Sequence, residues 1–224
     1  MKRASLVVVV CAVVAGGTAV LRAQDAAKVD PAHYKVLIDN PSVRVLDINY
    51  APGAKSVMHQ HPDSIVVPLT AAKVEFTMPD GKTQTLDMAK DSATYTPAGT
   101  HNPKNLGTTA MHAILVEFKG AAPGQATLPA NRPGMQLKPL AEGPYGSAYI
   151  STAGPDFAEA AGTKHDFDQV VIALGPSSMS LSVDGKPAKT AWKRGDAQFI
   201  GRGVAHEAKN TGGKPVDMMI IAIK

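Results

Sequence analysis

Two histidines separated by one residue are the first candidates for chemistry in this sequence. His59 and His61 lie in a segment that reads as a short β-strand, and side chains two positions apart on a strand point to the same face. Their Cα atoms would lie about 6.5 Å apart, so both imidazoles could bind one divalent ion at about 2.0–2.1 Å. A third ligand must come from a neighbouring strand, and His101 is the candidate.

The same arrangement recurs in the second half of the chain. His165 follows His61 by 104 residues, and His206 follows His101 by 105. An Asp-Gly pair, which favours a hairpin turn, recurs with the same offset of 104 residues. One register held over this length predicts a tandem duplication.

The elements that position these histidines should be short strands. Apolar residues alternate with polar ones at Leu46, Ile48 and Tyr50, a period typical of half-buried strands. The chain has 44% hydrophobic but only 5% aromatic residues, with 20 Gly and 17 Pro, which favours an all-β fold rich in turns. Between the copies, residues 120–147 are so rich in Pro and Gly that we expect a linker without strands.

The first 23 residues are typical of a secretory signal peptide. Lys2 and Arg3 precede an apolar run over 6–21, and small residues follow around Ala23. We expect cleavage there, a periplasmic or secreted protein, and no membrane association after cleavage. An uncleaved membrane anchor is the alternative, although the run is short against the roughly 20 residues that span a bilayer.

Charge and cysteine content exclude several function classes. The leader holds three of the 23 Lys and Arg residues, so 20 basic residues remain against 19 acidic ones, a net charge of +1. That balance argues against a nucleic-acid partner. Cys11 is the only cysteine and lies in the leader, so the remaining chain has no disulfide, thiolate metal ligand or cysteine nucleophile.

The histidine spacing resembles the two motifs of the cupin superfamily. The matching segments are Gly53-x5-His59-x-His61, Pro97-x-Gly99-x-His101-x3-Asn105 and, in the second copy, Gly201-x-Gly203-x2-His206-x3-Asn210. The chain therefore resembles a bicupin over most of residues 40–224. Its first half is also similar to small three-His cupins, including those assigned to β-alanine degradation.

This resemblance implies two tandem double-stranded β-helix (jelly-roll-like) barrels packed edge to edge, over 36–119 and 148–224. It implies Fe, Mn, Ni or Zn held by His59, His61 and His101. Cupins usually add a glutamate, but Ile65 stands at that position, so the first site resembles the three-His cupins such as cysteine and acetylacetone dioxygenases. By strand parity we expect Ile65 to face the same cavity as the histidines.

The second copy departs further from the motif. Thr163 replaces the first histidine and Gln169 stands where glutamate is usual. Two His, a Thr and a Gln make a poor set of ligands for a divalent ion. We therefore expect the second barrel to carry a degenerate site.

The resulting functional hypothesis is a cupin that binds a small polar molecule at the first metal site. A dioxygenase-type enzyme is one outcome; a non-catalytic binding or sensing module, or a metal-dependent isomerase or decarboxylase, is the alternative. An enzyme needs a proton-transfer residue, and the candidates are Tyr95, His112 and Glu75. Glu75 and Glu117 are the carboxylates that could replace the missing metal ligand. The resemblance is also compatible with a homo-oligomer.

Overall fold

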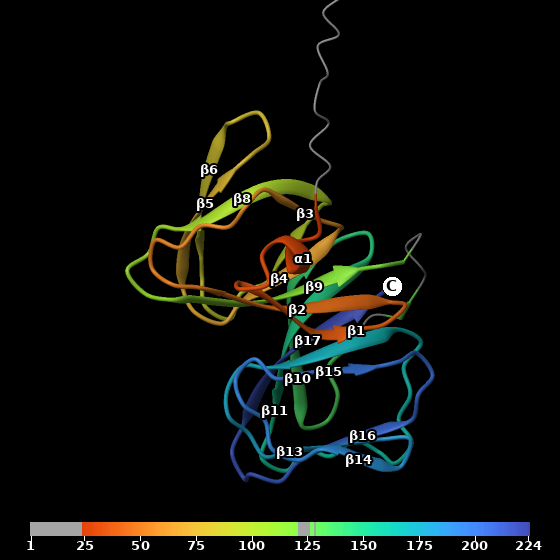
Figure 1. Cartoon of the computed structure of the whole chain (residues 1–224). Coiled ribbons are helices and arrows are strands. Elements are labelled where there is room, and N and C mark those ends of the chain that lie inside the picture. Colours follow the sequence, from red (N-terminus) through yellow and green to blue (C-terminus); the bar gives the residue numbers. More distant parts are fainter. Residues whose placement is uncertain (1–23, 121–125, 128) are drawn as a thin grey trace, which may run out of the picture.

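The computed structural model describes residues 24–120, 126–127 and 129–224, and nearly all regular structure in this part is β-strand (Figure 1). Residues 1–23, which hold the predicted signal peptide, lie outside the described residues. A single helical turn, α1 (Ala26–Val29), precedes the strands and is capped by the Asp25 side chain, which accepts a hydrogen bond from the Ala27 amide. Within the described ranges, no helix has the length and hydropathy needed to cross a bilayer.

The first half folds into a barrel of two facing antiparallel sheets. One sheet has the order β1-β2-β9-β4-β7, and the other has the order β3-β8-β5-β6. The strands are β1 (Tyr34–Asp39), β2 (Val43–Tyr50), β3 (His59–His61), β4 (Ser64–Pro68), β5 (Ala72–Thr77), β6 (Thr83–Met88), β7 (Thr94–Thr96), β8 (Gly99–Asn105) and β9 (Met111–Phe118).

The second half repeats this topology. One sheet has the order β10-β11-β17-β12-β15 and the other the order β14-β13-β16, so each strand occupies the place of its counterpart in the first barrel. The strands are β10 (Met135–Glu142), β11 (Gly146–Ala153), β12 (Asp168–Ala173), β13 (Met179–Val183), β14 (Lys186–Lys189), β15 (Ala197–Ile200), β16 (His206–Asn210) and β17 (Val216–Ile223). The prediction of an all-β fold with two similar barrels is confirmed.

One prediction about the connection between the copies is wrong. Residues 120–147 were expected to hold no strand, yet β10 lies within them and pairs with β11 over its whole length. Pro139 is accommodated because β10 is the edge strand of its sheet and the register shifts between Pro139 and Ala141. An edge position or a bulge is where a sheet tolerates a residue without an N–H donor.

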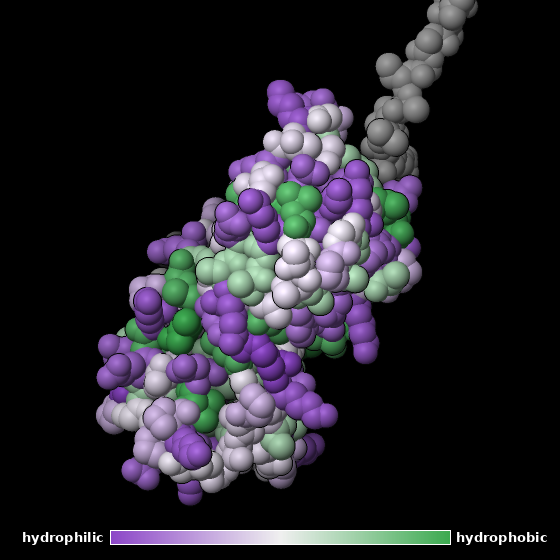
Figure 2. Space-filling model, turned by 90° about the vertical axis from the view of Figure 1, so that its left-hand side faces the viewer, coloured by the Kyte–Doolittle hydropathy of each residue, from purple (hydrophilic) through white to green (hydrophobic). Residues whose placement is uncertain are grey.

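The two barrels pack through the faces of their five-stranded sheets and not edge to edge. Apolar side chains of β2, β4 and β9 meet those of β11, β12 and β17 in one buried cluster that includes Ile65, Val116, Val170 and Ile221. Arg194 adds polar contacts across the boundary, donating to the Leu69 carbonyl and pairing with Asp91. The outer face drawn in Figure 2 is mainly hydrophilic with scattered hydrophobic residues, as expected for a surface around such a core.

Candidate metal centre

Three histidines meet inside the first barrel because of the register between β3 and β8. His59 pairs directly with His101, and His61 pairs with Gly99. His59 and His61 are two apart on β3 and therefore share a face. One ring nitrogen from each of the three side chains lies within 4.8 Å of the other two, so small rotations bring all three to the roughly 2.1 Å bond length of a divalent transition metal.

Burial keeps the imidazoles of His59 and His101 neutral, which metal binding requires. Desolvation, and to a smaller extent the neighbouring histidines, lowers the pKa of His59 to about 4 and that of His101 to about 3. His59 donates its Nδ1 hydrogen to the Val57 carbonyl at 2.8 Å. This bond fixes the tautomer and leaves the Nε2 lone pair directed at the cluster.

A buried carboxylate lies behind His61. Glu117 on β9 is 1% exposed and accepts a hydrogen bond from His61 Nδ1 at 2.6 Å. Its other oxygen accepts from Arg44 Nε, and Arg44 pairs in turn with Asp25. Burial alone would raise the pKa of Glu117, but the hydrogen bonds from His61 and Arg44 outweigh it and lower the pKa. Glu117 thus orients His61 and places negative charge next to the cluster, as carboxylates often do for metal-binding histidines.

A tyrosine from the strand that follows α1 reaches the same cluster. Tyr34 donates its hydroxyl hydrogen to His59 Nε2 at 3.0 Å and accepts one from the Tyr50 hydroxyl at 2.9 Å. Desolvation raises the pKa of Tyr34 well above its usual value, so the phenol stays protonated. Tyr34 was not among the residues predicted from the sequence, because its position at the start of β1 belongs to neither histidine motif.

A cavity of about 90 Å³ adjoins the histidines. Its polar groups include His61, His101, Tyr34 and Tyr50, and most of the remaining wall is apolar. The apolar side chains in that wall are Ile48, Val66, Val74, Phe76, Met88, Pro97, Pro103, Met111 and Leu115. Three imidazoles beside this small cavity form a donor set that fits a divalent transition metal with room for one small ligand.

Comparison with known proteins supports the fold. No family model matches the chain, and no curated protein matches it. AerE from Microcystis aeruginosa superposes with a TM-score of 0.63 at 14% identity, covering 86% of this chain and 97% of AerE. Salicylate 1,2-dioxygenase from Pseudaminobacter salicylatoxidans also gives a TM-score of 0.63, at 12% identity over 88% of this chain and 79% of the enzyme. The chain has a cupin fold.

The same dioxygenase in its adduct with gentisate has a TM-score of 0.61 at 13% identity, over 83% of this chain and 70% of the enzyme. At these identities the likeness covers the fold alone. The matched part covers 83–88% of this chain, so the likeness in fold extends over both barrels.

The prediction that Ile65 faces the cupin cavity is wrong. Ile65 is fully buried in the core between the barrels, whereas Ser64 and Val66 line the cavity. Strand parity fails here because β3 ends at His61 and two residues intervene before β4 begins. Among the described residues, no carboxylate joins the three histidines as a ligand, and Glu117 contacts His61 from behind.

The three candidates for proton transfer do not lie in the cavity. Tyr95 donates to Asp63 at 2.7 Å and stacks against Phe118 at the boundary between the barrels. His112 contacts Asp47 at 2.6 Å and is partly exposed. Glu75 lies between two cavity-lining residues of β5, so its side chain projects from the opposite face of the sheet. The hydroxyl group that reaches the histidines is instead that of Tyr34, 3.0 Å from His59 Nε2.

The second barrel brings its two histidines together as well. Thr163 pairs with His206 as His59 pairs with His101, which agrees with the loss of the first histidine. A third group was missed, because Glu159 lies with His165 and His206 in one cluster of ligand atoms within 4.8 Å. The set considered from the sequence, two His, a Thr and a Gln, did not include this carboxylate. Glu159 has no counterpart in the cupin motifs and stands in a loop, so no pattern pointed to it.

Proposed function

We propose that the protein binds a divalent transition metal through His59, His61 and His101 and holds a small oxygen-bearing molecule on that ion. The observation that carries this proposal is the convergence of three imidazoles beside a small cavity, with the lowered pKa values of His59 and His101 keeping these two neutral. Fe, Mn, Ni and Zn all accept imidazole ligands, and three protein ligands leave coordination positions for a ligand or water.

Dioxygenation of that small molecule is the reaction we favour. A bound divalent ion would supply a Lewis-acidic centre for a chelating substrate and O2. The likeness to salicylate 1,2-dioxygenase, whose structures include adducts with gentisate, supports this choice at the level of the fold. Isomerisation or decarboxylation on the same ion are the other reactions compatible with this site, because one cupin fold hosts many chemistries.

The residues of this chain have separate tasks in the proposed site. Glu117 and the Val57 carbonyl hold two imidazoles in orientation through their Nδ1 hydrogens. Tyr34 offers the bound molecule a hydrogen bond from a phenol that stays protonated. The apolar wall, which includes Phe76 and Leu115, excludes water and selects a small, partly apolar compound.

Metal content of the untagged protein tests the proposal. His59→Ala should remove the ion from this site, while His112→Ala, a matched change outside the cavity, should not. O2 consumption is then measured with the Fe²⁺-loaded protein on small catechols, hydroxybenzoates and β-diketones. Metal binding with no turnover on any of them would favour the second candidate function, a binding or sensing module, which the predominantly apolar cavity wall supports. Equal metal content in His59→Ala and the parent would contradict the site itself.

We also propose that the protein is exported and that residues 1–23 are removed. The support is the charged start, the short apolar run and the small residues near Ala23. Intact-mass measurement of the protein from the periplasm or medium tests it. A mass that includes Lys2 and Arg3 would show that the leader is retained.

A further inference from the structure

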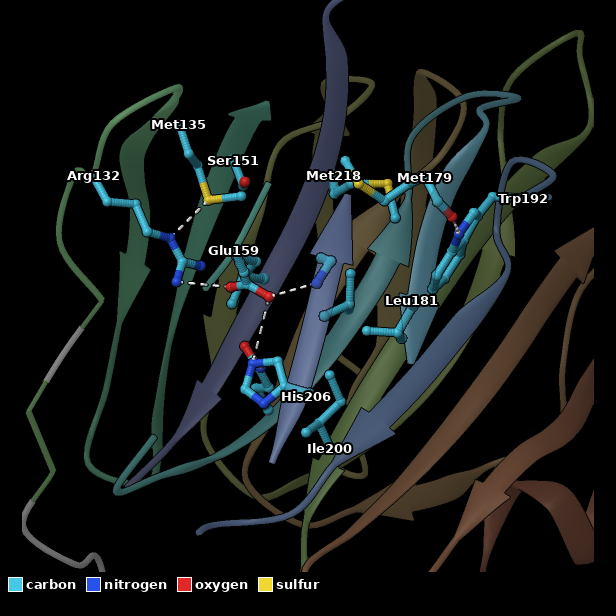
Figure 3. Close-up of a pocket in the computed structure, with 14 residues that line it drawn as sticks. Arg132, Met135, Ser151, Glu159, Met179, Leu181, Trp192, Ile200, His206 and Met218 are labelled. Atoms are coloured by element: carbon cyan, nitrogen blue, oxygen red, sulfur yellow. Dashed lines mark hydrogen bonds and ion pairs between the residues drawn. The ribbon is translucent and has the colours of Figure 1, made fainter. Parts of the chain in front are cut away.

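The second barrel contains a buried carboxylate between two histidines, which its sequence motif does not predict. Glu159 and His165 lie in the loop between β11 and β12, and His206 begins β16. The side chains of Glu159 and His206 are each only 3% exposed. Figure 3 shows Glu159 between Arg132 and His206 at one end of a pocket that is otherwise mostly apolar.

The two buried groups are held by the backbone so that they face each other. His206 donates its Nδ1 hydrogen to the Val204 carbonyl at 3.1 Å, which leaves the lone pair on Nε2 directed into the cluster. Glu159 Oε1 accepts from Arg132 Nη1 at 2.7 Å, and Oε2 accepts from the Ala208 amide at 2.8 Å. Both residues are therefore oriented before any ligand arrives.

The spacing within the cluster leaves room for an ion. Glu159 Oε2 and His206 Nε2 are 3.9 Å apart, which is too long for a hydrogen bond. A nitrogen and an oxygen that bind one transition-metal ion lie about 2.0–2.2 Å from it. The observed separation is just below the sum of those two bonds, so an ion fits between the two atoms in a bent arrangement.

The second histidine of the cluster, His165, completes the set and opens a route to it. The His165 ring centroid lies 4.8 Å from that of His206, and its ring stacks on Phe167. His165 also lines an outer depression of about 420 Å³, which shares Gln169 with the inner pocket. An ion can therefore reach the cluster from solvent past His165.

We infer that the second barrel binds a divalent transition-metal ion through Glu159, His165 and His206. Two imidazoles and one carboxylate are a ligand set that such ions accept. The amide nitrogen of Gln169 lies 3.4 Å from His206 Nε2, and this contact would have to give way to the ion. The guanidinium of Arg132 offsets the charge of Glu159, so this site should bind its ion more weakly than the first.

An ion pair between Arg132 and Glu159 alone would explain fewer of these contacts. An ion pair between Arg132 and Glu159 would need neither the lone pair of His206 Nε2 directed into the cluster nor the second imidazole of His165 within it. In the first barrel the counterpart of Glu159 is Ser56, because the backbone amides of both residues donate to matching carbonyls, those of Pro103 and Ala208. Lys55 and Ala158 each form a bridge to the matching lysine, Lys104 and Lys209 respectively, so the two loops are equivalent and only their side chains differ.

Equilibrium dialysis with Co²⁺ against the metal-free full-length protein tests the inference, and the visible absorption of bound Co²⁺ gives a second readout. We expect two ions per chain in the parent and one in His59→Ala, whose remaining ion belongs to the second barrel. Glu159→Gln should also bind one, and the double variant none. Glu207→Gln is the matched control, because its side chain is exposed next to His206, and it should keep both ions.

These outcomes separate the two sites. If His59→Ala binds no Co²⁺, or if Glu159→Gln binds as much as the parent, the second site is refuted whatever happens in the first. If His59→Ala loses nothing, the proposed function fails while the second site can still stand. His165→Ala guards against misfolding, since His165 is partly exposed; it should remove the same ion as Glu159→Gln without lowering the thermal stability of the protein.

Discussion

Replacing Glu117 by glutamine removes the negative charge behind His61 and keeps the shape of the side chain. The carboxylate is 1% exposed and accepts hydrogen bonds from His61 Nδ1 and Arg44 Nε. The substituted side chain would still offer one acceptor oxygen, but its amide group would face either a second N–H donor or the imidazole. The variant therefore weakens the orientation of His61 and leaves the Arg44 charge less well compensated.

The expected magnitudes follow from these contacts. Loss of an outer carboxylate partner of a metal-binding histidine typically costs 10- to 100-fold in metal affinity, or about 1.4–2.7 kcal/mol. Removing one partner of a buried ion pair costs about 3–5 kcal/mol of stability. Arg44 keeps its pair with Asp25, so we expect a loss near the lower end, about 3 kcal/mol.

The assay is competition for Zn²⁺ with a chromophoric chelator, together with urea unfolding of the metal-free protein. Glu75→Gln is the matched control, because Glu75 lies on the opposite face of its sheet from the cavity, and both quantities should stay within error of the parent. A Glu117→Gln protein that is destabilised but binds Zn²⁺ with parental affinity would refute the role of Glu117 in positioning His61.

The pH dependence of the same variant gives an independent check. The pKa of Glu117 is lower in the folded protein than its ordinary value, so its contribution to stability is present above the unfolded pKa. That contribution is lost as pH falls through the folded pKa. Glu117→Gln should therefore flatten the acid limb of the stability profile below about pH 4.5, relative to Glu75→Gln.

Three further predictions concern the same cavity. Tyr34→Phe removes the hydroxyl group that contacts His59 Nε2, so the affinity for Zn²⁺ should rise. The free energy of unfolding should fall by about 1 kcal/mol, because the hydrogen bond from Tyr50 is lost. Weaker Zn²⁺ binding would show instead that the hydroxyl supports the site. The folded pKa values of His59 and His101 lie below the ordinary value of histidine. The metal-free protein should therefore lose stability against urea as the pH falls from about 6.5 to about 4. A stability that stays constant over that pH range would contradict the burial of these two residues as neutral groups. Val66→Glu should increase metal retention, because it places a carboxylate in the cavity. Ile65→Glu should instead lower the melting temperature, because it buries a charge between the barrels. A higher metal content in Ile65→Glu than in Val66→Glu would restore the sequence-based assignment of Ile65.

The three histidines of the first barrel could be predicted from the sequence because their convergence depends on local rules. His59 and His61 share a face by strand alternation, and His101 follows the hairpin that brings β8 beside β3. The prediction for Ile65 used the same alternation but extended it across Pro62 and Asp63, where the strand is interrupted. Alternation holds within one strand only, and a two-residue break is enough to reverse which side chains face the core.

Tyr34 was missed, and Glu117 was predicted only as a possible metal ligand, because the contacts of both residues join distant segments. Glu117 reaches His61 because β9 lies between β2 and β4 in the sheet, an order that spacing along the chain does not reveal. Tyr34 reaches His59 from the opening strand, across a sequence separation of 25 residues. Neither position carries a pattern of its own, so only the packed structure connects them with the histidines.

The offset between the two copies is not constant, and it changes where β12 begins relative to β4. The burial pattern of β4 from Ser64 to Pro68 repeats in β12 from Gln169 to Ala173, an offset of 105 and not 104. The counterpart of Gln169 is therefore Ser64, and both residues line the cavity of their own barrel. The segment between His165 and Gln169 is one residue longer than the segment between His61 and Ser64. Counting the same number of residues from His61 as from His165 therefore selected Ile65 and not Ser64.

The two barrels place similar charges in different order around equivalent histidines. In the first barrel, imidazoles face the cavity and the carboxylate of Glu117 lies behind them, next to Arg44. In the second, the carboxylate of Glu159 itself faces His206, and Arg132 lies behind it. An ion in the first barrel would keep most of its charge toward the cavity, where it can attract an anionic ligand. An ion in the second would be partly neutralised by its own ligand and suits a structural role better, so the first barrel is where exchange of small molecules should be sought.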